Sequence, residues 1–158
     1  MRLTTAICLA STILLAGSAS AGTTKGTGGG KSGTVTIGGN AQDGTPTGTA
    51  DKGTFTFNDT NRSSYTASLD CVRTTGDTTF FSGVIRIASR IARQTLGILP
   101  GFTYVYGEFY DSGEPNVADT FELLLINPDG SEDPALYCET DRAGQTYALD
   151  SGNLQVKP

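Results

Sequence analysis

The link DSGEPNVAD, from Asp111 to Asp119, gathers carboxylates between two segments rich in aromatic and β-branched residues. Asp111, Glu114 and Asp119 carry the hard oxygen ligands that calcium prefers in extracellular modules. Their spacing differs from that of an EF-hand loop, and Asp also serves turns by accepting hydrogen bonds from nearby backbone N–H groups. The link is therefore a candidate calcium site. The simpler interpretation is a structural turn that Gly113 and Pro115 shape.

A pair of carboxylates, Glu108 and Glu122, lies on the two segments that flank this link. Glycoside hydrolases need two acidic residues that face each other across a cleft, and nothing in the sequence places this pair so. The chain contains no His, which excludes His-based catalytic triads and His-ligated zinc. A small hydrolase that uses acidic residues is the last of three functional hypotheses.

Aromatic residues at strand spacing are candidate ligand contacts: Tyr104, Tyr106, Phe109 and Tyr110. Exposed tyrosines would stack on sugar rings, whereas buried ones would fill a core. The spacing favours the core. The absence of Trp also weakens a sugar-stacking platform.

Arg86, Arg90 and Arg93 form the basic cluster of an otherwise acidic sequence. They would line one side of a helix, or Arg86 and Arg90 one side of a strand. The cluster is a candidate anion or partner site. The commoner alternative is a solvated face that pairs with the chain's own carboxylates.

Residues 1–21 have the organisation of a secretory signal peptide. Arg2 provides the charged region, residues 3–16 the apolar region, and Ala19-Ser20-Ala21 the cleavage motif. The apolar run is too short for a convincing membrane anchor. We expect a secreted protein, extracellular or periplasmic, with no membrane span after signal cleavage.

Two cysteines, Cys71 and Cys138, follow the signal peptide. In an oxidising compartment they are expected to form one disulfide, with a free thiol pair or a thiolate nucleophile as the alternative. The formal charge of the chain is −5. Binding to nucleic acid or anionic membranes relies on clustered Lys and Arg, so neither is expected as a partner.

β-prone segments separated by turn signals recur along the chain. The expected strands are 34–37, 53–57, 64–71, 78–87, 102–110, 120–126, 135–139, 146–149 and 153–156. This pattern of about nine short strands predicts an all-β, mainly antiparallel sandwich or barrel. Residues 88–96 fit either a short helix or a strand. Residues 22–33 read as a flexible Gly/Thr-rich leader before a single β domain at 34–158.

The second half of the chain contains Gly113-Glu114-Pro115, Ala118-Asp119-Thr120-Phe121 and the terminal run Ser151-Gly152-Asn153-Leu154-Gln155-Val156. These runs resemble the D-x-G-E-P-G-x-x-D-x-F stretch and the G-G-N-I-Q motif of the post-COAP (post-choice-of-anchor) type domain of secreted bacterial proteins. Asn116 stands where Gly is usual, and Ser151 replaces the first Gly of the second motif. The resemblance implies a secreted β domain and supplies no catalytic residues.

These observations favour a secreted, non-enzymatic β-sandwich module for extracellular or cell-surface interactions. Its partner would be an extracellular or envelope component, either a protein or a polysaccharide. A polysaccharide-binding module that uses Tyr104, Tyr106 or Tyr110 is the first alternative, and the small hydrolase is the second.

Overall fold

The computed structural model describes residues 24–44, 51–61, 63–113 and 117–157, and the structural statements below concern these residues. Nine strands form one antiparallel sheet in the order β8-β7-β6-β5-β4-β3-β2-β1-β9. The expected all-β, antiparallel fold is confirmed. The strands are β1 (Thr24–Ser32), β2 (Val35–Asp43), β3 (Lys52–Asp59), β4 (Ser64–Thr75), β5 (Thr78–Ala88), β6 (Tyr104–Tyr110), β7 (Thr120–Ile126), β8 (Gln145–Ala148) and β9 (Ser151–Lys157).

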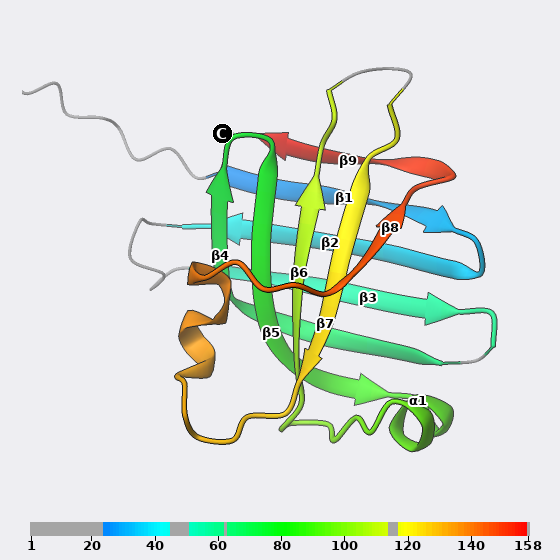
Figure 1. The fold of residues 1–158 in the computed structure, drawn as a ribbon, viewed down its shortest axis with the longest axis vertical. Helices are drawn as coiled ribbons and strands as arrows, with labels where there is room; N and C mark the ends of the chain where they lie inside the picture. The colour runs from blue at the N-terminus through cyan, green and yellow to red at the C-terminus, as the bar shows by residue number, and fades with distance from the viewer. Residues whose placement is uncertain (1–23, 45–50, 62, 114–116, 158) are drawn as a thin grey trace, which may run out of the picture.

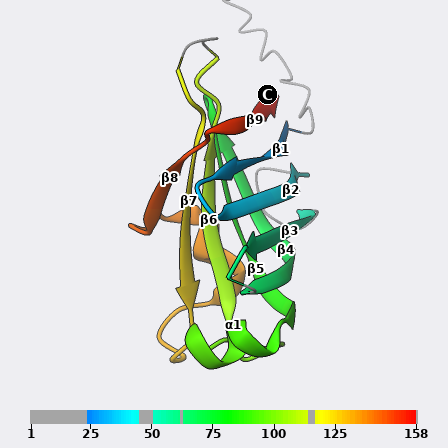
Figure 2. The same cartoon turned by 90° about the vertical axis from the view of Figure 1, so that its right-hand side faces the viewer.

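The sheet curls so that its two halves pack against each other. Figure 1 shows β9, β1, β2 and β3 running across the picture behind β5, β6 and β7, which run along it. In Figure 2 the two layers are seen from the side, with β7 and β8 opposite β2 and β3. The β4–β5 pair has register shifts at Thr66/Ala67 and at Leu69/Cys71. Such irregularities bend strands, which lets one sheet supply both layers.

The two edge strands of the sheet meet at a corner. β8 and β9 lie at opposite ends of the strand order, yet only Leu149 and Asp150 separate them in the chain. The Leu149 N–H donates to the carbonyl of Asp119 at 2.9 Å, and the Asp150 N–H donates to that of Lys31 at 2.7 Å. These two hydrogen bonds therefore connect the layer that contains β7 to β1.

Alternating apolar side chains from both layers fill the space between them. Its centre holds Phe55, Phe81 and Phe109, whose ring centroids lie 5.2, 6.1 and 4.7 Å apart in tilted arrangements. Aromatic pairs favour such geometry over direct face-to-face stacking. The surrounding core residues include Ile37, Tyr65, Leu69, Val72, Ile85, Val105, Phe121, Leu149 and Leu154.

The Gly-rich segment expected to be a flexible leader is strand β1, so that prediction is wrong. β1 pairs with β2 on one side and β9 on the other, which satisfies its backbone. Its interior positions are glycines because the opposite layer lies close. A Cβ on Gly26 would lie 2.6 Å from Oγ1 of Thr79, and one on Gly30 would lie 2.6 Å from Cδ1 of Leu149. β1, which lies ahead of residue 34, is therefore part of the same sheet as the later strands.

Residues 135–139, expected to be a strand, belong to the 3-10 helix η1 (Pro134–Glu139). Pro134 suits the first turn of a helix because that position needs no N–H donor. The Asp133 carboxylate accepts a hydrogen bond from the Ala135 N–H at 3.0 Å and caps the helix. The expected number of strands was reached only because β1 takes the place of this segment.

Residues 88–96, whose sequence fits either a short helix or a strand, contain the short helix α1 (Arg90–Thr95). The Ser89 hydroxyl accepts a hydrogen bond from the Ala92 N–H at 3.1 Å, as an N-cap does. Gly97, just beyond the helix, has a φ of 66°. In the described part of the chain, no helix is long and apolar enough to cross a membrane.

The segment between β7 and β8, residues 127–144, is called the crossing segment because it runs over the outer face of β5, β6 and β7 (Figure 1). The predicted disulfide between Cys71 and Cys138 is confirmed, and it ties this segment to β4. Beneath the segment, Val84 and Tyr106 are buried on the outer face of the sheet, and Tyr137 is buried within η1. The crossing segment therefore covers a second, smaller apolar cluster.

Candidate functional site

Two carboxylates of the predicted calcium site hold the free edge of β9. Oδ2 of Asp119 accepts a hydrogen bond from the Leu154 N–H at 2.7 Å, and Oδ2 of Asp111 accepts one from the Val156 N–H at 3.1 Å. Leu154 and Val156 are two residues apart, so their N–H groups point to the same edge of the strand. The opposite edge of β9 pairs with β1. The two aspartates thus act as a clamp between the β6–β7 link and β9.

The remaining oxygens of these carboxylates bond within the link. Oδ1 of Asp119 accepts from the Ser112 N–H at 3.1 Å, and Oδ1 of Asp111 accepts from the Gly113 N–H at 3.0 Å. Gly113 has a φ of 64°, the left-handed conformation expected of it in a turn. The structural-turn interpretation accounts for these contacts. Glu114 lies outside the described residues, so calcium binding at Asp111, Glu114 and Asp119 stays a prediction.

Glu108 and Glu122, the candidate hydrolase pair, are cross-strand partners on β6 and β7. Glu122 attaches the chain that follows the crossing segment. Its Oε1 accepts from the Gly144 N–H, and its Oε2 accepts from Oγ1 of Thr146 at 3.0 Å. Both oxygens of Glu122 therefore already have donors from the protein.

Glu108 takes part in a chain of hydrogen bonds beneath the crossing segment. The Tyr106 hydroxyl donates to Oε1 of Glu108 at 2.5 Å and accepts from the Arg142 N–H at 3.2 Å. Burial raises the pKa of the Glu108 carboxyl, and the hydrogen bond from Tyr106 opposes that shift. The arrangement positions the crossing segment on the sheet.

The tyrosines proposed as ligand contacts differ in exposure. Tyr106 is 0% exposed, so the prediction that it contacts a ligand is wrong and the core interpretation applies to it. Tyr104 is half-buried and meets Tyr137 edge-on, with ring centroids 5.6 Å apart. Tyr110 is 43% exposed at the end of β6, and Phe109 lies in the core. The tyrosines therefore do not form one stacking platform.

The predicted arginine cluster is divided between two elements. Arg86 is exposed on β5, whereas Arg90 and Arg93 are exposed on α1. Burial raises the pKa of Asp70, and the positive charge of Arg86 acts against that shift. Arg86 thus has a carboxylate of the chain in its neighbourhood, as the solvated-face interpretation supposes.

The other two described arginines hold the crossing segment. Arg73 pairs with Asp141 at 2.5 Å, and its guanidinium carbon lies 4.1 Å from the centre of the Phe80 ring. Arg142 pairs with Glu132 at 2.5 Å and lies over the ring of Tyr137. No lysine takes part in an ion pair among the residues that the structure describes.

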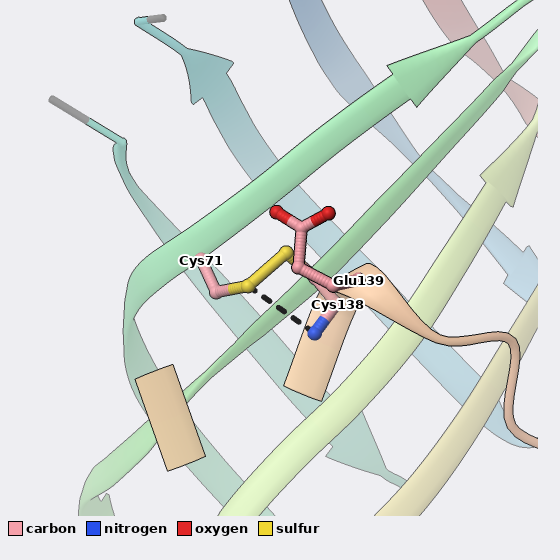
Figure 3. A group of neighbouring side chains, drawn as sticks. All are labelled: Cys71, Cys138 and Glu139. Carbon is pink, nitrogen blue, oxygen red and sulfur yellow. Dashed lines mark hydrogen bonds between the residues drawn. A yellow bond between two sulfur atoms is a disulfide. The ribbon is translucent and has the colours of Figure 1, made fainter. Parts of the chain in front are cut away.

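Cys71, Cys138 and Glu139 bring metal-binding residue types close together (Figure 3). The two sulfurs are bonded to each other and are therefore not thiolates, the form in which Cys binds metals. Sγ of Cys71 also accepts a hydrogen bond from the Cys138 N–H at 3.2 Å. This group is a structural bridge.

An exposed polar surface covers the outer side of β9, β1, β2 and β3, which lie side by side in Figure 1. Paired residues in neighbouring strands point to the same side of a sheet, so their side chains form rows across it. We call these rows the polar face, and they contain neither a carboxylate nor an apolar side chain. Its rows are Lys157-Lys25-Gln42-Lys52, Gln155-Thr27-Asn40-Thr54, Asn153-Gly29-Gly38-Thr56 and Ser151-Lys31-Thr36-Asn58.

A groove of about 460 Å³ lies over the first two of these rows. It is lined mainly by Lys25, Thr27, Asn40, Gln42, Lys52 and Thr54. Within it, Oδ1 of Asn40 accepts a hydrogen bond from the Thr54 N–H at 2.9 Å, which fixes the amide group. The sequence predicted none of these residues as a site, because they come from three separate strands.

A second groove, of about 490 Å³, opens into the core between β3–β4 and β7–β8. Its lining includes Phe57, Tyr65, Leu96, Leu123, Leu125 and Tyr147. The rings of Phe57 and Tyr65 stack with centroids 4.9 Å apart, and Tyr147 stacks on Phe121 at 4.7 Å. These rings already cover one another, so this groove is an opening of the apolar core.

Comparison with known proteins adds no relative to these observations. No protein-family model, curated protein or solved structure matches the chain significantly. The resemblance to the post-COAP type domain therefore stays a prediction that rests on the quoted motifs.

Proposed function

We propose that this chain is a non-enzymatic binding module that acts outside the cell and contacts its partner through the polar face. The observation that carries the proposal is the polar face itself, with its groove of about 460 Å³ over the exposed side chains of Lys25, Asn40, Lys52 and Thr54 and the half-buried ones of Thr27 and Gln42. A sheet holds the backbone of such residues at fixed spacings, so only their side chains lose freedom when a partner binds.

An extracellular or envelope component is the proposed partner. The motif at residues 1–21 supports export, and a disulfide such as Cys71–Cys138 is compatible with the oxidising conditions found there. An exposed face of lysines and neutral polar side chains suits a partner rich in hydrogen-bonding groups, because each group that loses water on binding needs a new donor or acceptor.

The first alternative, polysaccharide binding through tyrosines, lacks support at Tyr106, which is fully buried. The polar face offers that function a different set of contacts. The contacts of the carboxylate pair weigh against the hydrolase alternative, because both oxygens of Glu122 and one of Glu108 already hold hydrogen bonds within the protein.

Co-sedimentation of the protein with the envelope of the producing cells and with insoluble polysaccharides tests the proposal. Thr54→Trp should abolish binding, since Thr54 is exposed and lines the groove. Leu136→Trp is the control, because Leu136 is 57% exposed on η1, outside the polar face. Both variants are first checked for the cooperative unfolding of the parent. Binding that survives Thr54→Trp, or binding to no fraction at all, would contradict the proposal.

A further inference from the structure

We infer that the polar face binds an anionic polysaccharide, whose acidic groups contact the row formed by Lys157, Lys25 and Lys52. This inference rests on the proposed function and adds the chemical class of the partner. It comes from the distribution of charge over the fold, because the polar face is positively charged although the chain as a whole is negatively charged.

All four lysines of the chain, Lys25, Lys31, Lys52 and Lys157, lie on β1, β3 and β9. Lys25 is directly opposite Lys157 in the sheet, and Lys52 follows on the other side of Gln42. Like charges directly opposite each other destabilise a sheet. The chain has 16 Asp and Glu residues that could neutralise these lysines, yet none of them occupies the rows of the polar face. An anion bound across the row would relieve the repulsion.

The carboxylates nearest to this row in the sequence serve other contacts. Asp43 and Asp51, which flank the loop between β2 and β3, accept hydrogen bonds from backbone N–H groups of β4 at 3.3 and 2.8 Å. Asp70 of β4 is exposed, and its charge interacts with Arg86. Asp43 and Asp51 therefore have hydrogen-bond partners other than a lysine, and the positive charge of Arg86 acts on Asp70.

The shape and chemistry of the groove favour a polysaccharide among polyanions. Next to the lysine row, Thr27, Asn40 and Thr54 offer neutral donors and acceptors to hydroxyl groups. Strands lie about 4.8 Å apart, so the row from Lys157 to Lys52 spans about 14 Å and would contact several consecutive units of a chain laid across it.

Nucleic acids and membranes fit this surface less well. Single-stranded nucleic acids are held by aromatic side chains on which the bases stack, and the rows of the polar face contain none. A surface that binds membranes inserts apolar side chains, which these rows also lack. Binding to nucleic acid and binding to membranes are each measured in the test below.

The test measures the affinity of the protein for dextran sulfate, a polyuronate and unmodified dextran by titration calorimetry at physiological ionic strength. The triple variant Lys25→Gln, Lys52→Gln and Lys157→Gln should lose about tenfold in affinity for the two polyanions, as expected for three solvent-exposed ion pairs. Unmodified dextran should bind weakly to the parent and to the variant.

A matched control removes the same net charge elsewhere, through Arg86→Gln, Arg90→Gln and Arg93→Gln. These arginines are exposed on β5 and α1, so their loss should change the affinity less than twofold. The lysine variant should also be at least as stable as the parent to urea, because it loses like-charge repulsion.

Equal losses in the two triple variants would overturn the inference, since they would indicate a response to net charge alone. Failure of the parent to bind either polyanion would overturn it too, as would equally tight binding of duplex DNA or anionic vesicles. The proposed function is judged separately: envelope binding that Thr54→Trp abolishes would uphold it even if the lysine variant binds as the parent does.

Discussion

Replacing Asp119 with alanine is expected to weaken the whole sheet, because this carboxylate joins the β6–β7 link to the edge of β9. Asp119 is 9% exposed, and it accepts hydrogen bonds from the Leu154 N–H at 2.7 Å and the Ser112 N–H at 3.1 Å. Leu154 is itself 0% exposed, so water has poor access to the N–H that the substitution would leave behind.

The expected loss follows from these two bonds. A hydrogen bond to a charged group contributes about 1.5–3 kcal/mol, and a buried N–H left without an acceptor costs about 1–3 kcal/mol. We expect Asp119→Ala to lower the free energy of unfolding by about 3 kcal/mol, mostly through the Leu154 N–H. For a chain of this size such a loss corresponds to a decrease in Tm of roughly 6–12 °C.

Urea unfolding followed by circular dichroism measures this loss, and two further variants calibrate it. Asp111→Ala should cost about 1 kcal/mol, because the bond that Asp111 accepts from the Val156 N–H is only partly buried. Asp129→Ala is the control, since the Asp129 carboxylate bonds only Ser131 in an exposed turn, as far as the structure describes its contacts. A loss at Asp119 no larger than that at Asp129 would refute the clamp.

The same measurement tests the predicted calcium site. If the aspartates act as a clamp, Asp119→Ala should cost the same with excess calcium and with a chelator. If calcium stabilises the parent but does not stabilise Asp119→Ala, a metal binds at these carboxylates.

Three other predictions concern stability. Replacing Cys71 and Cys138 together with serine should lower the free energy of unfolding by about 4 kcal/mol in the chain-entropy model, since the bridge spans 67 residues; a loss under 1 kcal/mol by urea unfolding would contradict this. Gly30→Val should cost about 1–3 kcal/mol by overpacking, because its Cβ would lie 2.6 Å from the Ser151 carbonyl oxygen. The exposed neighbour Lys31→Val should change stability by less than about 0.5 kcal/mol, and equal effects of the two would argue against a packed β1. Burial raises the pKa of Glu108, so its ionisation disfavours the folded state as the pH rises through the interval between its ordinary and its raised pKa. The stability of Glu108→Gln relative to the parent should therefore increase from acidic to neutral pH in urea unfolding, and a difference independent of pH would contradict the assignment.

Features that depend on neighbouring residues were predicted well. The alternation in β4, β5, β6 and β7 placed those strands, and the four-residue spacing near Ile91 allowed the helix that forms as α1. The disulfide followed from there being two cysteines after the predicted signal peptide of a chain expected to be exported. Each of these inferences uses propensity, periodicity or redox compartment, which are local or compositional properties.

The two errors in the fold have different origins. β1 is a strand although glycine has low β-propensity, because β2 and β9 supply its hydrogen bonds and the opposite layer leaves no room for side chains at Gly26 and Gly30. Residues 135–139 look like a strand but lie outside the sheet, where Pro134 and Asp133 start a helix instead. Tertiary contacts override the local preference at β1, whereas at residues 135–139 the local helix-starting residues Asp133 and Pro134 decide the structure.

The candidate sites show the same division. The sequence predicted that Asp111 and Asp119 belong to one turn. The structure adds that both carboxylates bind β9, and that Leu154, the partner of Asp119, follows it by 35 residues. Arg86, Arg90 and Arg93 are close in sequence yet divided between β5 and α1.

By itself the sequence determined the class of fold, the disulfide, the turn residues and the predicted export of this protein, because these depend on composition and on short-range spacing. Only the tertiary structure decided which residues form a surface. Lys25, Lys52 and Lys157 are scattered along an acidic chain and carry no local signal, yet strand order and register place them in one row. Register is fixed by the pairing of whole strands and by the core that their alternate side chains fill, so it follows from the complete fold.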